Sequence, residues 1–203
     1  KRVAESVDAR YPFRLNTGRL RDQWHGMTRS GRVAQLWGHA PEPVVTLHPA
    51  DLSRRGFAHG DIVRIDSRRG TLHLPVSASD DVRPGQAFIP MHWGSRYLSG
   101  DGVNALTLSM YDPSSRQPEL KHCAVRITTA ELPWRAIAFG LPEGGDANAL
   151  HNALQFMLER FTFASCTMTG GREGVVFRAA AETAPPSQWV AELHRLFALD
   201  ADT

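Results

Sequence analysis

Residues 15–29 hold the densest group of side chains in this sequence that could bind a polar ligand. Within four residues, the segment Asn16–Arg19 supplies a hydroxyl, a glycine amide and a guanidinium. Backbone amides beside a glycine can form a concave anion site, and an arginine can neutralise a phosphate or face a carbonyl edge. Judged by residue chemistry alone, the same mixture also suits an ordinary surface loop.

The residues that follow add a flat ring and further hydrogen-bonding groups. They are Gln23, Trp24, His25 and Thr28, and a site for a polar heterocycle would require such a combination. Arginines also crowd this part of the chain, at positions 10, 14, 19, 21, 29 and 32. A solvated basic face would explain these arginines equally well. The formal net charge of +2 gives no reason to expect nucleic acid as a partner.

The composition is that of a globular protein with a buried core, with 42% hydrophobic and 22% charged residues. The two cysteines, Cys123 and Cys166, form no CxxC pair, and the nine histidines show no HExxH spacing. A disulfide scaffold, a zinc ribbon and an iron–sulfur cluster held by this chain alone are therefore not expected. No apolar run approaches the ~20 residues of a membrane span, and no signal peptide is visible, so we expect a cytoplasmic protein without a membrane segment.

Short strands joined by turns dominate the first two thirds of the sequence. Apolar or alternating runs predict strands over residues 44–47, 61–67, 71–76, 87–90 and 123–127. Pro49 and Gly56 predict the start and the end of a short helix after the first of these strands. This order lacks regular βα alternation, so it favours a mainly β fold with α decoration, arranged as a compact barrel. We assign residues 8–130 to this domain.

The remaining residues, 133–203, follow a different pattern. Strands are predicted over residues 134–140, 163–169 and 174–181, and a helix over residues 146–161, which begins at Asp146. A second amphipathic helix follows, with apolar residues at positions 189, 190, 193, 196 and 197. The resulting β-α-β-β-α order predicts a small α+β appendage. It shows no catalytic group, so we expect it to serve in packing or docking.

Four ordered blocks of sequence carry a resemblance to a known family. The first block consists of Tyr11-Pro12, Leu15-Asn16-Thr17-Gly18-Arg19 and Trp24-His25-Gly26-Met27-Thr28. The second consists of His48–Asp51, Gly56, Gly60–Val63 and Ser67–Gly70, and the third of Arg83–Gly85 and Pro90–Trp93. The fourth consists of Val103–Thr107, Asp112-Pro113 and Lys121–Val125. Together they resemble the C-terminal cofactor domain of the dimethyl sulfoxide reductase family of molybdenum enzymes, and most closely that of assimilatory and periplasmic nitrate reductases.

The resemblance implies both a fold and a cofactor. The implied fold is a six-stranded double-psi β-barrel, and the implied cofactor is molybdenum bis-(molybdopterin guanine dinucleotide), in which two dinucleotides hold one molybdenum through dithiolene sulfurs. Matching positions imply that Thr17, Gly18 and Arg19 lie in a loop that approaches the cofactor. They also imply that Gln23, Trp24, His25 and Thr28 surround the pterin, and that Asn104 and Lys121 make later polar contacts.

Two further features of the matching blocks have more than one interpretation. The Pro-Met-His-Trp form at residues 90–93 is similar to the assimilatory enzymes. His92 is a candidate cofactor contact, but a core position for Trp93 and a loop-capping role for His92 are equally plausible. Cys123 lies in an alternating strand and is expected to be a small buried hydrophobe. It is not expected to bind molybdenum, because the family places that ligand in another domain.

In function, the resemblance implies the cofactor-binding part of an oxidoreductase that reduces nitrate to nitrite by oxygen-atom transfer, with this chain inactive alone. The implied partners are the remaining domains of the catalytic subunit, which would hold any iron–sulfur cluster, and an electron-donor protein. Two alternatives remain open. One is the same domain of a formate dehydrogenase or another molybdenum or tungsten enzyme. The other is a free-standing double-psi barrel that binds a protein, although a peptide groove would not need the Asn-Thr-Gly-Arg and Asn104 blocks.

Overall fold

The computed structural model describes residues 3–141, 146–170 and 174–197. The chain forms two compact units, which we call the barrel unit and the sheet unit. The barrel unit comprises residues 1–19, 43–91 and 102–130, and the sheet unit comprises residues 20–42, 92–101 and 131–203. Among the described residues, no helix has the length and apolar character that crossing a membrane would need.

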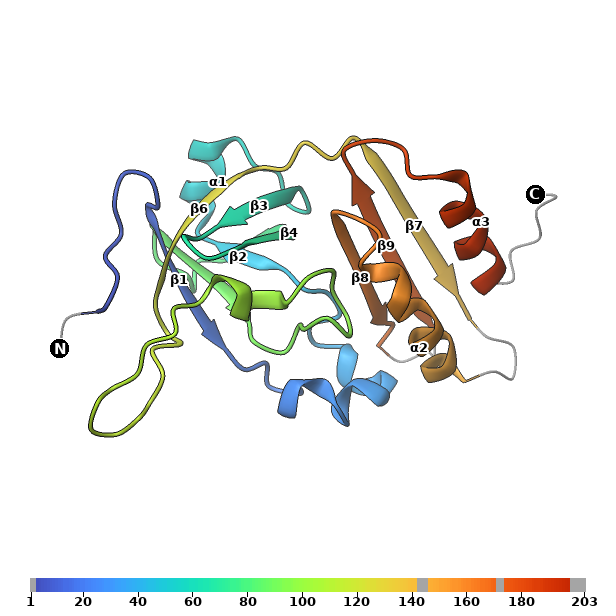
Figure 1. The fold of residues 1–203 in the computed structure, drawn as a ribbon, viewed down its shortest axis with the longest axis horizontal. Coiled ribbons are helices and arrows are strands. Elements are labelled where there is room, and N and C mark those ends of the chain that lie inside the picture. The colour runs from blue at the N-terminus through green and yellow to red at the C-terminus, as the bar shows by residue number, and fades with distance from the viewer. Residues whose placement is uncertain (1–2, 142–145, 171–173, 198–203) are drawn as a thin grey trace. The chain divides into compact units, whose positions relative to one another are not determined.

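The barrel unit is a closed barrel of six strands in the order β1-β5-β2-β4-β3-β6 (Figure 1). The pairs β1/β5 and β2/β4 are parallel, and the other pairs are antiparallel. This topology confirms the mainly β fold and the six-stranded barrel that the sequence predicted. The strands are β1 (Phe13–Gly18), β2 (Val45–Leu47), β3 (Ile62–Asp66), β4 (Thr71–Ala78), β5 (Gln86–Pro90) and β6 (Cys123–Thr129).

Alternation along the strands fills the interior of the barrel. In β1, Phe13 and Leu15 are buried while Arg14 and Asn16 are exposed, because successive strand residues point to opposite faces. The predicted short helix is α1 (Pro49–Arg55), and Gly56 ends it in the left-handed conformation with φ of 70°. A 3-10 helix, η4 (Gly102–Leu106), precedes the long connection to β6.

The sequence pattern did not predict β1, and the loop expected at Thr17, Gly18 and Arg19 is wrong for its first two residues. Thr17 and Gly18 are the last two residues of this strand, parallel to Ile89 and Pro90 of β5. The alternation in β1 rests on only two large apolar residues before a threonine, too few for a clear pattern. Parallel pairing with a strand distant in sequence stabilises β1.

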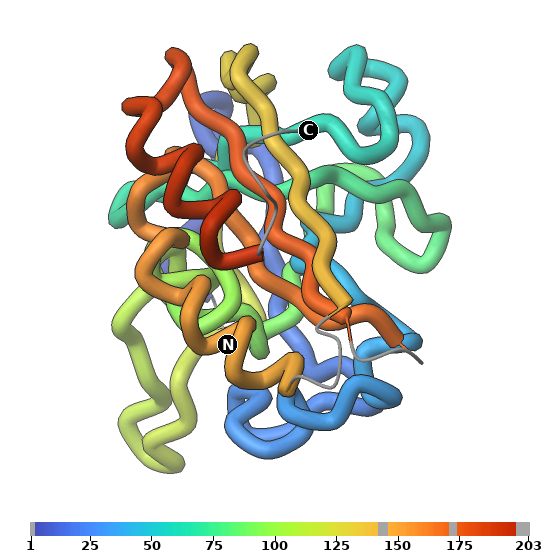
Figure 2. Tube along the Cα trace, turned by 90° about the vertical axis from the view of Figure 1, so that its right-hand side faces the viewer, coloured from blue at the N-terminus to red at the C-terminus, as the bar shows by residue number. Residues whose placement is uncertain are grey.

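The sheet unit contains the predicted β-α-β-β-α order. Its elements are β7 (Trp134–Gly140), α2 (Ala147–Leu158), β8 (Phe163–Met168), β9 (Val175–Ala181) and α3 (Ser187–Leu196). The strands form an antiparallel sheet in the order β7-β9-β8. Asp146 caps α2 by accepting a hydrogen bond from the Asn148 amide, as expected. Both helices lie on one face of the sheet (Figure 2), and a Cβ on Gly140 would meet Phe197 at 2.7 Å and Leu150 at 3.3 Å.

Two earlier segments of the chain complete the sheet unit. Residues 97–99 lie along the edge of β8, where Leu98 forms a β-bridge with Ser165 and the Cys166 amide donates to the Tyr97 carbonyl at 2.9 Å. All six residues of β8 are buried. The rings of Trp37, Trp93 and Tyr97 pack together, with centroid distances of 5.5, 5.5 and 6.2 Å. Segments assigned to the 8–130 domain therefore pack with the 133–203 module, and the domain boundary itself stays a prediction.

Three short helices precede β2 in the chain. They are η1 (His25–Met27), η2 (Ser30–Arg32) and η3 (Ala34–Trp37). They place the polar segment around Trp24 in the sheet unit, whereas Thr17 and Gly18 belong to the barrel unit.

Candidate functional site

The end of β1 brings three predicted contact residues together. The Thr17 hydroxyl donates to the Leu120 carbonyl at 3.0 Å, and the Lys121 ammonium donates to the Thr17 carbonyl at 2.5 Å. A Cβ built on Gly18 would lie 3.7 Å from the Lys121 Nζ atom. Thr17 is buried and Lys121 is exposed, so the hydroxyl anchors the strand end while the ammonium remains open to a ligand.

Gly18 leaves a bare stretch of backbone at this strand end. A Cβ there would meet the ring of Phe88 at 3.0 Å, so any larger residue would push that ring. A glycine in a strand often marks a place where another group approaches the backbone closely. Arg19 follows directly and is exposed. The strand end therefore combines a backbone position without a side chain with two exposed cationic residues, an arrangement suited to an anion.

Asn104 lies elsewhere on the barrel unit, on η4. Its side chain is exposed, and its carbonyl accepts bonds from the Thr107 amide and hydroxyl at 3.2 and 3.0 Å. The backbone of η4 packs on the turn between β3 and β4, where a Cβ on Gly70 would lie 2.7 Å from the Ala105 carbonyl oxygen. Only a glycine fits there, so the turn determines where η4 lies.

The four candidates between residues 23 and 28 differ in exposure. Gln23 is 2% exposed, and its amide donates to the Leu36 carbonyl and accepts from the Ser30 hydroxyl. The Gln23 side chain is thus occupied in supporting the loop. Trp24 is 56% exposed, and His25 and Thr28 are also exposed. These three are the side chains of this segment that a ligand could reach.

The backbone of this segment is unusual. His25, Gly26 and Met27 all have positive φ, at 45°, 61° and 62°. Positive φ in non-glycine residues costs about 1–3 kcal/mol each and clusters at ligand sites. The surroundings hold this conformation: Met27 is fully buried and its carbonyl accepts from the Tyr97 hydroxyl at 2.9 Å. The Trp24 and His25 rings of this segment are exposed, and their centroids lie 5.3 Å apart.

His92 and Trp93 are both buried in the sheet unit, at 4% and 2% exposure. The Leu20 amide donates to Nε2 of His92 at 3.0 Å, which requires a neutral ring with its proton on Nδ1. Trp93 occupies the core, and its indole Nε1 has no partner among the described residues. The core position of Trp93 is as expected, and His92 fixes the chain just after Arg19. A cofactor contact by His92 stays a prediction.

Two cavities of the barrel unit lie apart from the predicted contacts. One, of about 480 Å³, crosses the outer face of four strands and is lined by Asn16, Thr46, Ser77 and Phe88 among others. The other, of about 430 Å³, lies between Val3–Ala4 and residues 110–119. No predicted contact residue lines either cavity. The candidate site is therefore a set of residues at strand and loop ends, and its exposed members are Arg19, Trp24, His25, Thr28, Asn104 and Lys121.

The barrel unit belongs to the class of closed six-stranded β-barrels, and it carries a glycine, a lysine and an arginine at the end of β1. Comparison with known families specifies this class. Residues 13–124 match the molydopterin dinucleotide binding domain, and the chain belongs to this family. The recognition made from the four sequence blocks is thereby confirmed.

Curated relatives agree with this family. The chain is similar to a nitrate reductase of Klebsiella oxytoca, with 43% identity over 66% of this chain. It is 44% identical over 62% of its length to a nitrate reductase of Synechocystis sp., and 38% identical over 64% to a periplasmic nitrate reductase of Desulfovibrio desulfuricans. The match covers 16%, 18% and 17% of these relatives. The chain thus spans about a sixth of the length of the relatives it matches.

Proposed function

We propose that this chain is the part of a nitrate reductase catalytic subunit that binds molybdenum bis-(molybdopterin guanine dinucleotide). The observation that carries this proposal is the family match over residues 13–124, which includes the Thr17–Gly18–Lys121 cluster. The names of the relatives support nitrate as the substrate and favour it over formate. The family description names a dinucleotide without its base, and we propose that the base is guanine.

The residues present fit such a cofactor. A pyranopterin dinucleotide carries a pyrophosphate and a flat, polar ring system. The bare backbone at Gly18, beside the Lys121 ammonium, suits an anionic group that approaches closely. The strained segment at His25–Met27 presents the exposed Trp24 ring, which suits contact with a flat heterocycle.

Each side chain has a proposed part in holding the cofactor. Arg19 and Lys121 neutralise negative charge, and the Gly18 amide approaches it. Trp24, His25 and Thr28 contact the pterin from the loop that Gln23 supports. The bound cofactor supplies the oxygen-atom transfer chemistry, while the protein supplies binding, orientation and electrostatics. No residue of this chain needs to act as a nucleophile or to transfer a proton.

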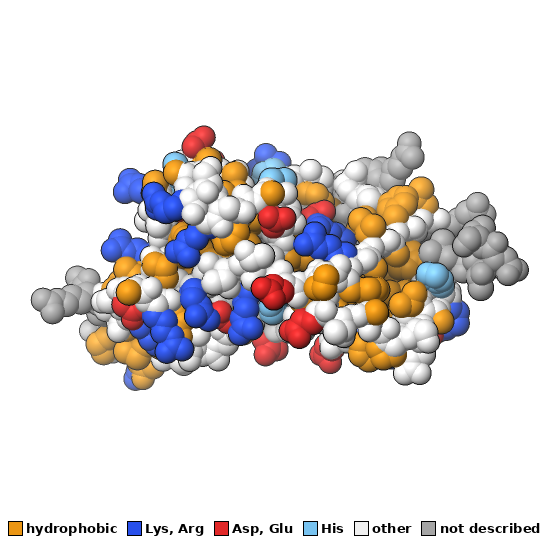
Figure 3. Space-filling model, turned by 90° about the horizontal axis from the view of Figure 1, so that it is seen from above, with side chains coloured by type: hydrophobic (Ala, Val, Ile, Leu, Met, Phe, Trp, Pro, Cys, Tyr) orange, Lys and Arg blue, Asp and Glu red, His pale blue; other side chains and the backbone are white. Residues whose placement is uncertain are grey.

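The 133–203 module is proposed to contact another domain of the same enzyme. On β7, Ile137 is 72% exposed and Phe139 is 51% exposed, and Leu141 follows at 46%. Hydrophobic side chains also gather in the right-hand half of Figure 3, inward of the grey atoms. A run of exposed apolar side chains on an edge strand is typical of a surface that another polypeptide covers. We also propose that the partners of this chain are the remaining domains of the catalytic subunit and an electron-donor protein. The proposed location of the enzyme is the cytoplasm.

The complete enzyme tests the proposed function. We expect the purified protein to contain molybdenum, to release guanosine monophosphate on acid hydrolysis, and to oxidise a reduced viologen dye when nitrate is added. Formate in place of nitrate should give no turnover. An enzyme with molybdenum that turns over formate alone would leave the cofactor assignment standing and overturn the substrate. A protein without molybdenum would overturn both.

A further inference from the structure

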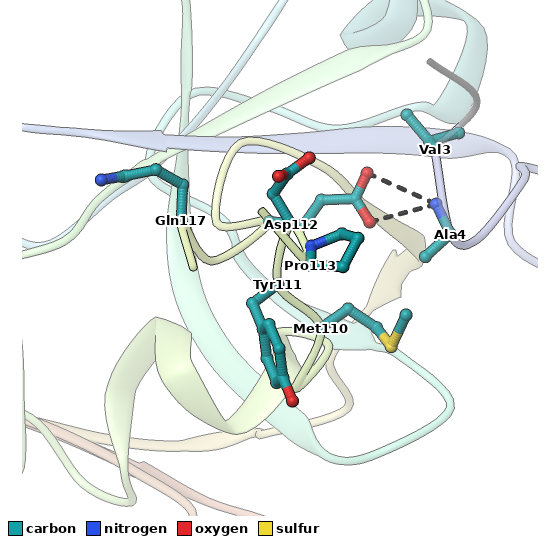
Figure 4. Close-up of a pocket in the computed structure, with 8 residues that line it drawn as sticks. Val3, Ala4, Met110, Tyr111, Asp112, Pro113 and Gln117 are labelled. Atoms are coloured by element: carbon teal, nitrogen blue, oxygen red, sulfur yellow. Dashed lines mark hydrogen bonds between the residues drawn. The ribbon is translucent and has the colours of Figure 1, made fainter. Parts of the chain in front are cut away.

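The N-terminal segment Ala4–Asp8 bonds to several distant parts of the barrel unit. The Ala4 amide donates to the Glu119 carboxylate at 3.0 and 3.4 Å (Figure 4). The Glu5 carbonyl accepts from Nε2 of His122 at 2.6 Å. Both partners flank Lys121 in sequence. The segment Ala4–Asp8 therefore holds residues 119–122, which include the proposed cofactor contact Lys121.

The Glu5 side chain is the centre of these contacts. Its carboxylate accepts from Arg68 at 2.6 Å, from Arg69 at 2.9 and 3.1 Å, and from the Ala124 amide at 3.1 Å. The side chain is only 10% exposed. Burial opposes ionisation, but the bonds from Arg69, Ala124 and Arg68 outweigh it and lower the pKa of Glu5 to about 2. The carboxylate is therefore charged at any physiological pH.

Arg69 extends this network to the loop that carries Asn104. Its Nε donates to the Leu106 carbonyl at 3.1 Å, and its Nη2 donates to the Cys123 sulfur at 3.2 Å. The Cys123 thiol donates to the same Leu106 carbonyl at 2.9 Å. One planar guanidinium thus joins Glu5, the end of η4 and β6. A lysine cannot make this set of contacts, because it lacks the rigid fork of donors.

We propose that Glu5 and Arg69 are positioning residues that hold the Asn104 and Lys121 segments in the geometry for binding the cofactor. The proposal rests on the proposed function for the identity of the ligand, and on the hydrogen bonds of Glu5 and Arg69 for the mechanism. Neither residue touches the ligand. Each acts through a segment that carries a proposed contact: Arg69 through the Leu106 carbonyl for Asn104, and the Glu5 carboxylate through the Ala124 amide for Lys121.

Amide hydrogen exchange combined with molybdenum spectroscopy tests the proposal in the complete enzyme. The variants are Glu5→Gln and Arg69→Lys, and the double variant combines them. We expect amide exchange to rise about tenfold or more at residues 102–107 and 119–124, with β2 and β4 unchanged. We also expect lower molybdenum content and a shifted Mo(V) electron paramagnetic resonance signal. The effects of the two substitutions should add to less than their sum in the double variant, because each single variant already disturbs the shared Glu5–Arg69 contact.

Arg64→Lys is the matched control. Arg64 lies on the same hairpin and pairs with Asp66 at 2.9 Å, without contacting η4, so this variant should leave exchange and the signal unchanged. Faster exchange spread over the whole barrel, or an unshifted Mo(V) signal at normal molybdenum content, would overturn the proposal. If the wild-type enzyme itself lacks molybdenum, the proposed function fails. Unchanged amide exchange at residues 102–107 in Arg69→Lys would refute the positioning role, whatever the molybdenum content.

Discussion

At the scale of single residues, the contacts separate side chains that support the site from side chains that are free to bind. Both ends of the Gln23 amide bond within the loop, and its cofactor contact stays a prediction. Composition and motif position could not show this, because a glutamine that holds a loop and one that binds a ligand look the same in sequence. The sequence analysis did not identify Glu5 and Arg69 as site residues, because their hydrogen-bond partners lie far away along the chain.

The first prediction concerns Arg19 and Asn104. In the complete enzyme, we expect Arg19→Ala to weaken cofactor binding about tenfold to hundredfold, because a charge-assisted contact contributes about 1.5–3 kcal/mol. Asn104→Ala should reduce occupancy as well. Molybdenum and pterin content are measured beside circular dichroism, and Arg14→Ala, an exposed arginine of β1, is the control. Unchanged occupancy in both variants, with the barrel folded, would refute these site assignments.

At the scale of elements, local signals predicted most helices and strands, and pairing between distant segments decided the rest. Pro49 and Gly56 mark the ends of α1, and Asp146 marks the start of α2, because caps are local chemistry. β1 escaped prediction because its stability comes from β5 and β6, which lie far along the chain. The packing of residues 97–99 against β8 was equally invisible to periodicity, since it joins segments more than sixty residues apart.

The second prediction concerns His151 on α2. Burial lowers its pKa to about 4, against the hydrogen bond that its ring donates to the Cys166 carbonyl at 3.2 Å. The unfolded chain, with a pKa near 6.5, binds more protons between these values, so stability falls as pH drops from about 6.5 towards 4. The free energy of unfolding falls by at most about 3 kcal/mol over this pH range.

His151→Gln keeps a donor for the carbonyl but does not titrate. Chemical unfolding measured between pH 4 and 7 should therefore show a smaller decline in unfolding free energy for this variant than for the wild type. His194→Gln, on the exposed surface of α3, serves as the control and should retain the wild-type decline. An equal decline in the His151 variant would refute the assignment.

At the scale of the whole molecule, the strand pattern predicted a compact, mainly β barrel and the α+β order, and the resemblance added the six-stranded form of the barrel. The distribution of the chain between the two compact units was not predictable from either. Residues 20–42 and 92–101 match the cofactor domain in sequence, yet they pack with β7, β8 and β9. Apolar content shows that a segment is buried, and only the contacts show which core it enters.

The third prediction concerns the boundary between residues 130 and 133. Expressed alone, residues 131–203 should give a dispersed proton–nitrogen NMR spectrum. The Ala164 and Cys166 amides, which bond to the Ser99 hydroxyl and the Tyr97 carbonyl at 2.9 Å, should exchange fast because those partners are missing. A collapsed spectrum would show that the module needs residues 20–42 and 92–101 to fold, and the predicted boundary would be withdrawn.

The central claim is that the end of β1 binds the cofactor, and the molybdenum content of a Gly18→Ala variant of the complete enzyme tests it most directly. An added Cβ at Gly18 would lie 3.0 Å from the Phe88 ring, on the backbone where the ligand is proposed to approach. Gly94→Ala is the matched control, because a Cβ there meets nothing within 4 Å. We expect molybdenum per protein to fall at least about tenfold in Gly18→Ala, in line with the loss of a charge-assisted contact, and to stay unchanged in Gly94→Ala. Full molybdenum content in a folded Gly18→Ala enzyme would contradict the claim.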